Sequence, residues 1–182
     1  RDVERSRGLG DVYKRQSLTL ILLLIGSCLA NTKLEQEYQT QQGKLQRESK
    51  AVKKVKILIK MSKINLKLAG QSVKNRRYSD ADRLLGRYVT TIKQAGQILK
   101  ASKRNPQRQP AGFKHLEIAL RRQLRQLADL ADSYPFNQKD TINRAQECAA
   151  LVKSKMITAL FGLDKNTQPL NDSLDSSGPK HP

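Results

Sequence analysis

The chain has 182 residues, with 35 Lys and Arg against 16 Asp and Glu, and a formal net charge of +19. This length is enough for one domain with a buried core, and the charge predicts an anionic partner or surface without bearing on the fold. Aromatic residues amount to five Tyr, three Phe and no Trp. Runs of Val, Ile and Thr with period two are absent after residue 30. The composition therefore argues against a β-sheet domain and predicts an all-α fold.

Residues 1–16 lack an initiator Met and contain the run DVYKRQ at positions 11–16. This run resembles translated sequencing-adapter read-through, and we interpret residues 1–16 as a non-native extension. The alternative is a natural basic region in front of an export signal, with Lys14 and Arg15 as its charges.

Residues 17–30, SLTLILLLIGSCLA, form an apolar run of fourteen residues. Such a run is too short to span a bilayer and is typical of a signal peptide. Residues 25–28 resemble a bacterial lipobox, in which Cys28 would be lipidated and become the mature N-terminus. The alternative is cleavage after Ala30 by an ordinary signal peptidase. Both routes predict an exported chain, in the periplasm or the cell envelope, and the first adds a lipid anchor.

Residues 31–50 are polar and rich in Gln. Leu34, Tyr38 and Leu45 continue only a weak helical stripe, so this segment is predicted to be a helical stalk with little burial. The longest helix is predicted to begin at Lys44 and to end near residues 75–77. It would be about ten residues longer than the later helices, so its N-terminal part is expected to overhang the bundle.

The segment 44–77 holds twelve Lys or Arg residues and a single acidic residue, Glu48. A helical turn of about 100° per residue separates its side chains into three lines. Two lines are apolar and lie on roughly opposite sides, so both need cover from other helices or from a partner. The first apolar line is Val52, Val55, Ile59, Leu66, Ala69 and Val73, with Ser62 filling its gap. The second is Ile57, Met61, Ile64 and Leu68, and between them runs a basic line of Lys53, Lys56, Lys60, Lys63, Lys67 and Lys74.

Three further helices are predicted from apolar residues at helical spacing over 81–99, 113–134 and 142–160. Ser79 is expected to cap the first of them, and Pro106, Pro110 and Pro135 separate them. The predicted core includes Leu84, Leu120, Leu124, Leu127 and Val152. The predicted architecture is a four-helix bundle-like domain over residues 51–163 with a long first helix. Residues 164–182 are rich in Asn, Asp, Ser, Pro and Gly and are predicted to be a disordered tail.

No catalytic, metal or cofactor site is predicted. His115 has no acidic residue three or four positions away, so a metal-binding pair on one helix is lacking. The sequence contains no Gly-x-Ser-x-Gly motif and no phosphate-binding Gly-rich loop. His115 is expected to be a partly buried flank of its helix, and Cys148 a small residue of the core.

A basic helical pair, the run KHLEIALRRQLRQLADL at positions 114–130 and the break at Pro135 follow the export segment in order. This order resembles that of small bacterial exported helical proteins to which no activity is assigned. The resemblance covers most of residues 17–163. It implies an exported location and a helical class, and nothing about chemistry.

Three functions follow as hypotheses. The first is an exported, non-catalytic binding or scaffold module whose basic line binds an anionic polymer, a membrane surface or an acidic protein. The second is an adaptor whose second apolar line pairs with a partner helix or with a second copy in a homodimer. The third is an enzyme with an unrecognised site. A nucleic acid is disfavoured by the export segment and by the lack of interleaved aromatic residues.

Overall fold

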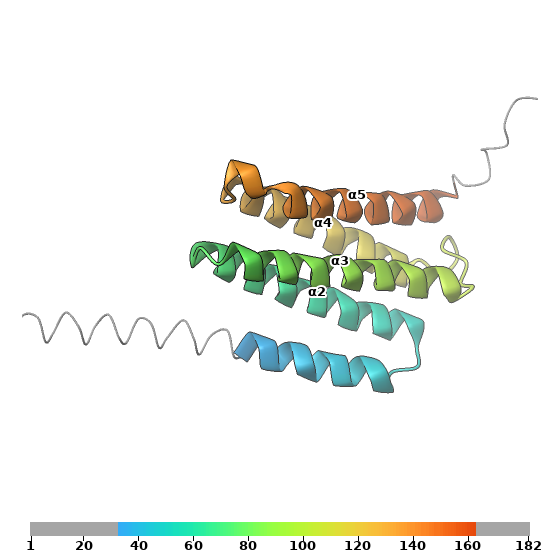
Figure 1. Cartoon of the computed structure of the whole chain (residues 1–182). Helices are drawn as coiled ribbons and strands as arrows, with labels where there is room; N and C mark the ends of the chain where they lie inside the picture. The colour runs from blue at the N-terminus through green and yellow to red at the C-terminus, as the bar shows by residue number, and fades with distance from the viewer. Residues whose placement is uncertain (1–32, 163–182) are drawn as a thin grey trace, which may run out of the picture.

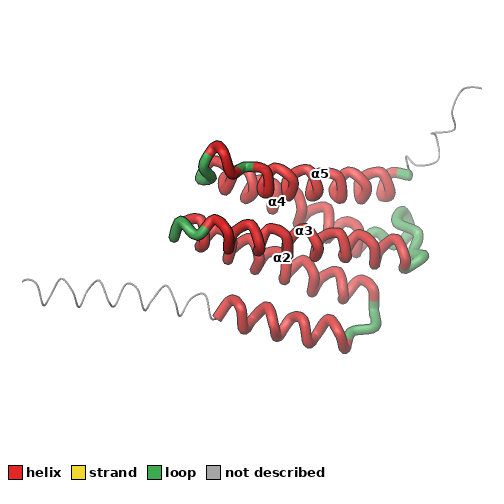
Figure 2. The backbone as a smooth tube through the Cα atoms, in the orientation of Figure 1, coloured by secondary structure: helices red, strands yellow, loops and turns green. Residues whose placement is uncertain are grey.

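The computed structural model describes residues 33–162, and every regular element in that range is helical (Figure 2). The helices are α2 (Ala51–Lys74), α3 (Tyr78–Ala101), α4 (Ala111–Asp132) and α5 (Asp140–Phe161), with a 3-10 turn at Phe136–Gln138. A further helix covers residues 33–47 and is called helix 33–47 below. The all-α prediction is confirmed. The predicted extension 1–16, the signal peptide 17–30 with Cys28, and the tail 164–182 lie outside the described residues.

The four labelled helices form two hairpins that pack together as a bundle. α2 pairs with α3 and α4 pairs with α5, while α3 packs on α5 and α2 packs on α4. Consecutive helices run in opposite directions, so the neighbours α2 and α4 run the same way (Figure 1). The apolar faces of the helices meet between them and form one core.

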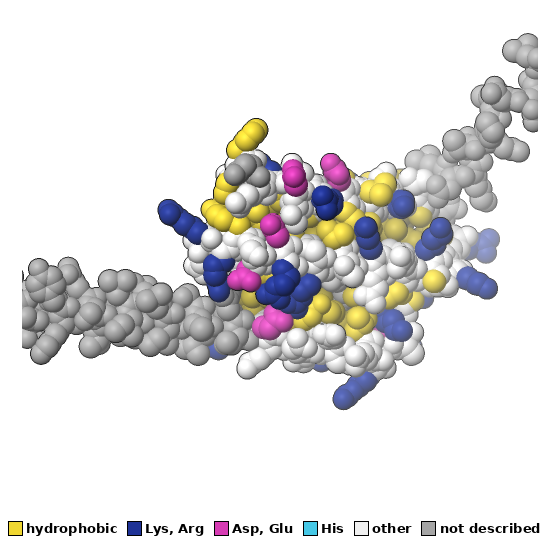
Figure 3. Space-filling view, viewed as in Figure 1, with side chains coloured by type: hydrophobic (Ala, Val, Ile, Leu, Met, Phe, Trp, Pro, Cys, Tyr) yellow, Lys and Arg dark blue, Asp and Glu magenta, His cyan; other side chains and the backbone are white. Residues whose placement is uncertain are grey.

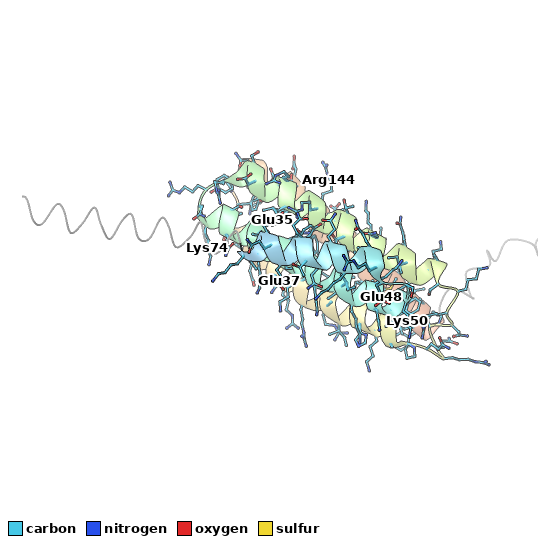
Figure 4. All side chains as sticks on the ribbon, turned by 90° about the horizontal axis from the view of Figure 1, so that it is seen from below. Glu35, Glu37, Glu48, Lys50, Lys74 and Arg144 are labelled. Atoms are coloured by element: carbon cyan, nitrogen blue, oxygen red, sulfur yellow. The ribbon has the colours of Figure 1, made fainter. Side chains whose placement is uncertain are left out.

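Helix 33–47 folds back along the bundle, which corrects the prediction of an overhanging first helix. It runs antiparallel to α2, so Glu35 and Glu37 lie at the same end of the molecule as Lys74, the last residue of α2 (Figure 4). Its weak apolar stripe, Leu34, Tyr38 and Leu45, packs against the core. The segment expected to be a stalk is therefore a fifth helix of the bundle.

Glu48 makes the hydrogen bonds that stabilise the turn between helix 33–47 and α2. The backbone N–H of Glu48 donates to Lys44 O at 3.1 Å, which closes the last turn of helix 33–47. The carboxylate of Glu48 then accepts the N–H of Lys50 at 2.9 Å, and Lys50 is the N-cap residue of α2. Because this carboxylate satisfies a free N–H at the start of the next helix, the chain reverses without a Gly or a Pro.

The predicted core faces of the later helices are largely confirmed. Leu84, Leu120, Leu127 and Val152 are buried, whereas Leu124 is only partly buried and packs at the margin of the core. α3 begins at Tyr78, so Ser79 lies inside the helix and the predicted cap is wrong. The Tyr78 ring lies 5.7 Å from that of Tyr134, so the first residue of α3 is packed against the end of α4.

One layer of the core is polar. Gln123 of α4 donates from Nε2 to Ser62 Oγ of α2 at 2.7 Å and accepts from Tyr88 OH of α3 at 3.3 Å. Asn65 lies one turn from Ser62 and is fully buried, yet its amide has no hydrogen-bond partner among the described residues. A short hydrogen-bond network of Ser62, Gln123 and Tyr88 thus ties the three helices together, and the buried Asn65 amide beside it stays unsatisfied.

Candidate functional site: a lysine ridge on α2

The six lysines of the predicted basic line are all exposed on α2, and we call them the lysine ridge: Lys53, Lys56, Lys60, Lys63, Lys67 and Lys74. They span 22 residues of one uninterrupted helix, and the 21 steps from Lys53 to Lys74 amount to about 31 Å at 1.5 Å per residue. A rigid helix sets the spacing of their Cα atoms, while each ammonium group moves on a flexible four-carbon stem. The ridge is therefore an elongated cationic strip.

The second apolar line of α2 is covered within the chain. Met61, Ile64 and Leu68 are buried, and Ile57 is partly buried. Met61 lines a cavity of about 410 Å³ together with Tyr38 and Leu45 of helix 33–47. Thr90, Thr91 and Gln94 of α3 line the same cavity, so helix 33–47 and α3 both lie against this line.

Arg87 of α3 holds helix 33–47 against the bundle. Its guanidinium pairs with the Glu35 carboxylate at 3.2 Å, and its Cζ lies 4.0 Å from the centroid of the Tyr38 ring. The Arg87 side chain is 24% exposed, so this combined ion pair and cation–π contact is partly shielded from water. Glu35, an acidic residue close to α2, is thereby engaged by α3.

Most lysines of the ridge form no ion pair with an acidic side chain of the described residues. Among the described residues, the ridge forms one ion pair within 4.0 Å, between Lys53 and Glu48 at 4.0 Å. Asp129 of α4 lines the same groove as Lys67 and Lys74, but it makes no such contact with either lysine. Asp132 of α4 and Glu147 of α5 likewise form no ion pair with the ridge in residues 33–162.

The electrostatic consequence is mutual repulsion along α2. Lysines three or four residues apart on one helix face destabilise it by roughly 0.2–0.5 kcal/mol per pair. Mobile counterions relieve part of this repulsion, and a partner with closely spaced negative charges would relieve more of it by releasing those counterions. The ridge can therefore bind anions electrostatically.

The other two residues considered from the sequence are His115 and Cys148. His115 is exposed rather than partly buried. Within residues 33–162, no group of three or more His, Cys, Asp or Glu side chains is placed to hold a metal ion. Cys148 is a free thiol, half-buried at the edge of the core, and burial raises its pKa.

A second cationic surface was missed by sequence reasoning. One groove between α3 and α5 is lined by Lys93, Lys100, Arg104 and Lys155. Lys155 is more than fifty residues away from the other three in the chain. The available signal was local: Lys93 and Lys100 lie three and four residues from Gly96, and so flank a position that has no side chain. Only the packing of α3 on α5 brings Lys155 to the same groove.

No helix within residues 33–162 is long and apolar enough to cross a membrane. Comparison with family models, curated proteins and solved structures finds no significant match to this chain.

Proposed function

We propose that this protein is an exported, non-catalytic helical binding module of the bacterial cell envelope that binds a linear anionic polymer through the lysine ridge. The export part of the proposal rests on the signal-like run at residues 17–30. The observation that carries the binding part is the exposure of all six lysines in one line, five of them without an ion pair among the described residues.

The shape of the ridge favours a polymer over a bilayer. Peripheral helices that enter a bilayer present apolar side chains beside their basic residues. On α2 both apolar lines are turned inward, and the large apolar side chains that are exposed in residues 33–162 belong to other segments: Ile118, Phe136, Leu151 and Phe161. The ridge therefore presents positive charge without exposed apolar side chains of α2 that could insert into a bilayer. These properties favour a hydrophilic polyanion as the ligand.

The adaptor alternative loses the surface on which it depended. That hypothesis needed the second apolar line of α2 to be free for a partner helix or a second copy. Met61, Ile64 and Leu68 of that line are at most 6% exposed, so pairing through them would require displacement of elements already packed there.

The test is binding of the purified protein to long-chain polyphosphate, followed by fluorescence anisotropy at several salt concentrations. The ridge variant replaces Lys56, Lys60, Lys63 and Lys67 by Gln. We expect its affinity at about 50 mM salt to fall by at least about tenfold, with a shallower dependence of log Kd on log salt, because fewer counterions are released.

A second four-charge variant serves as the matched control. It replaces the groove residues Lys93, Lys100, Arg104 and Lys155 by Gln and should lower affinity by less than about threefold, because only the distant field of the protein changes. Equal losses in both variants would show that net charge alone drives binding and would refute the ridge. Binding to vesicles with anionic lipid but not to the polymer would identify a membrane surface instead.

A further inference from the structure

A concave surface separate from the lysine ridge lies between α3 and α5, and we call it the α3/α5 groove. Its volume is about 780 Å³, within the usual range for small-molecule sites. It extends toward the loop that follows α3, where Arg104 and Pro106 line it. Figure 3 shows hydrophobic side chains between these two helices with Lys and Arg side chains around them.

The floor of the groove is apolar. Leu99 of α3, Phe113 of α4, and Val152 and Met156 of α5 line it while also belonging to the buried core. Their positions are therefore fixed by packing, so the floor is preformed. Leu151 adds an apolar side chain that is 55% exposed.

Gly96 keeps the groove open on the α3 side. A Cβ placed on Gly96 would meet no atom nearer than Val152 Cγ1 at 3.5 Å, which is an ordinary contact. The absence of a side chain here leaves space above Val152. A glycine inside a helix costs roughly 0.5–1 kcal/mol relative to alanine, so the space is maintained against helix propensity.

The rim of the groove is cationic. Lys93, Lys100 and Arg104 line it from α3 and the loop after it, Lys155 lines it from α5, and no Asp or Glu does so. None of the four makes an ion pair with a described residue. The ammonium groups of Lys93 and Lys155 both act on the Cys148 thiol, opposing the rise in its pKa that burial causes. Their positive fields thus overlap inside the groove.

We propose that the α3/α5 groove binds a single-chain anionic amphiphile, with its alkyl chain on the floor and its carboxylate or phosphate head group against the lysines of the rim. The floor favours an alkyl chain because it removes apolar surface from water, and the rim favours a negative head group. A purely hydrophilic anion would leave the floor uncovered. This site is separate from the lysine ridge and does not depend on the proposed function.

The test measures binding of sodium dodecanoate and dodecyl phosphate to the full chain by calorimetry, below the micelle-forming concentration. Inorganic phosphate provides the head group alone, and the uncharged detergent dodecyl maltoside provides the chain alone. We expect both anionic amphiphiles to bind at least about tenfold more tightly than either partial probe. A preference for dodecyl phosphate would indicate a lipid-type head group, and a preference for dodecanoate a free fatty acid.

Two variants locate the ligand. Gly96→Leu places an alkyl side chain in the groove with a residue that favours helix, and should weaken dodecanoate binding at least about tenfold. Replacement of Lys93, Lys100, Arg104 and Lys155 by Gln should weaken the anionic probes by a similar factor and leave dodecyl maltoside unchanged. The ridge variant at Lys56, Lys60, Lys63 and Lys67 removes equal charge elsewhere and should retain binding within about twofold.

Several results would overturn the proposal. These are equal binding of dodecyl maltoside and dodecanoate, binding of inorganic phosphate alone, or unchanged affinity in both groove variants. A further overturning result is binding seen only after Leu170 and Leu174 are replaced by Ser in the full chain, which would make residues 163–182 the occupant. Unchanged polyphosphate binding in the ridge variant would refute the polymer proposal alone, so the two failures can be told apart.

Discussion

At the scale of single residues, the most informative position is Asn65. It is fully buried in α2, and both polar atoms of its amide lack a hydrogen-bond partner among the described residues. A buried polar group left unsatisfied costs about 1–3 kcal/mol. One turn away, Ser62 is equally buried but has partners in Gln123 and the Ile59 carbonyl.

We therefore expect Asn65→Leu to raise the free energy of unfolding by about 1 kcal/mol or more. Leucine has the same number of side-chain heavy atoms and branches at the same carbon, so the packing change is small and the desolvated amide is removed. Denaturant melts measure the effect. Ser62→Ala is the control and should lower the free energy of unfolding, because it removes the hydrogen-bond acceptor of Gln123 Nε2. A destabilised Asn65→Leu protein would show that the amide is satisfied.

Leu120 and Leu124 give a second comparison within one helix. Both were predicted to be core residues, but Leu120 is 0% exposed and Leu124 is partly buried. Leu120→Ala should cost about 2–5 kcal/mol, because it leaves a cavity in a packed site. Leu124→Ala should cost less, because solvent and neighbouring side chains can fill the space. Equal losses in urea melts would mean that the margin of the core is as tightly packed as its centre.

At the scale of elements, the sequence predicts the interior faces well and the chain reversal poorly. The apolar residues at helical spacing on α3 are all buried, because helical periodicity follows burial: Ala81, Leu84, Leu85, Tyr88, Ile92, Ala95 and Leu99. The turn at Glu48 was missed because it lacks Gly and Pro and is held by a side-chain hydrogen bond. The two-sided apolar pattern of α2 was the usable signal, since it required an additional covering element.

Arg87 links helix 33–47 to α3, because its side chain contacts both Glu35 and Tyr38. A cation–π contact and a partly exposed ion pair together amount to about 1 kcal/mol. Arg87→Ala should therefore increase local opening of helix 33–47 by about fivefold in amide hydrogen exchange, with little change in α5. Arg83→Ala, which removes an exposed pair with Asp80, is the control. Unchanged exchange would show that apolar contacts alone hold this helix.

The two surfaces proposed for binding differ in how well the sequence predicts them. The lysine ridge follows from one helix, because its spacing and the lack of acids are local properties of residues 49–79. The α3/α5 groove requires that Gly96 and Val152 come within contact, which no periodicity specifies. Sequence patterns thus show surfaces carried by one element, whereas surfaces shared by several elements depend on how those elements pack.

At the scale of the whole molecule, positive charge opposes folding. A chain with a net charge of +19 repels itself when compact, and the ridge concentrates that repulsion on α2. Lys53, Lys56, Lys60, Lys63 and Lys67 follow one another at steps of three or four residues. Replacing the last four by Gln removes all of these adjacent like-charge pairs.

The ridge variant should therefore be more stable than the parent, by about 1–2 kcal/mol at low salt, from roughly 0.2–0.5 kcal/mol per pair. Near 1 M salt the Debye length falls to about 3 Å, so the difference between the two proteins should largely disappear. Urea melts of both proteins across this salt range provide the measurement.

The groove variant removes no like-charge pair three or four residues apart within a helix, because Arg104 lies beyond the end of α3, and should gain less. A ridge variant that gains nothing at low salt would mean that the lysines are already neutralised within the protein, and the ridge would then have no excess charge to offer a polymer. A gain in stability together with lost polyphosphate binding would show that the repulsion along α2 is retained at the expense of folding and relieved by the partner.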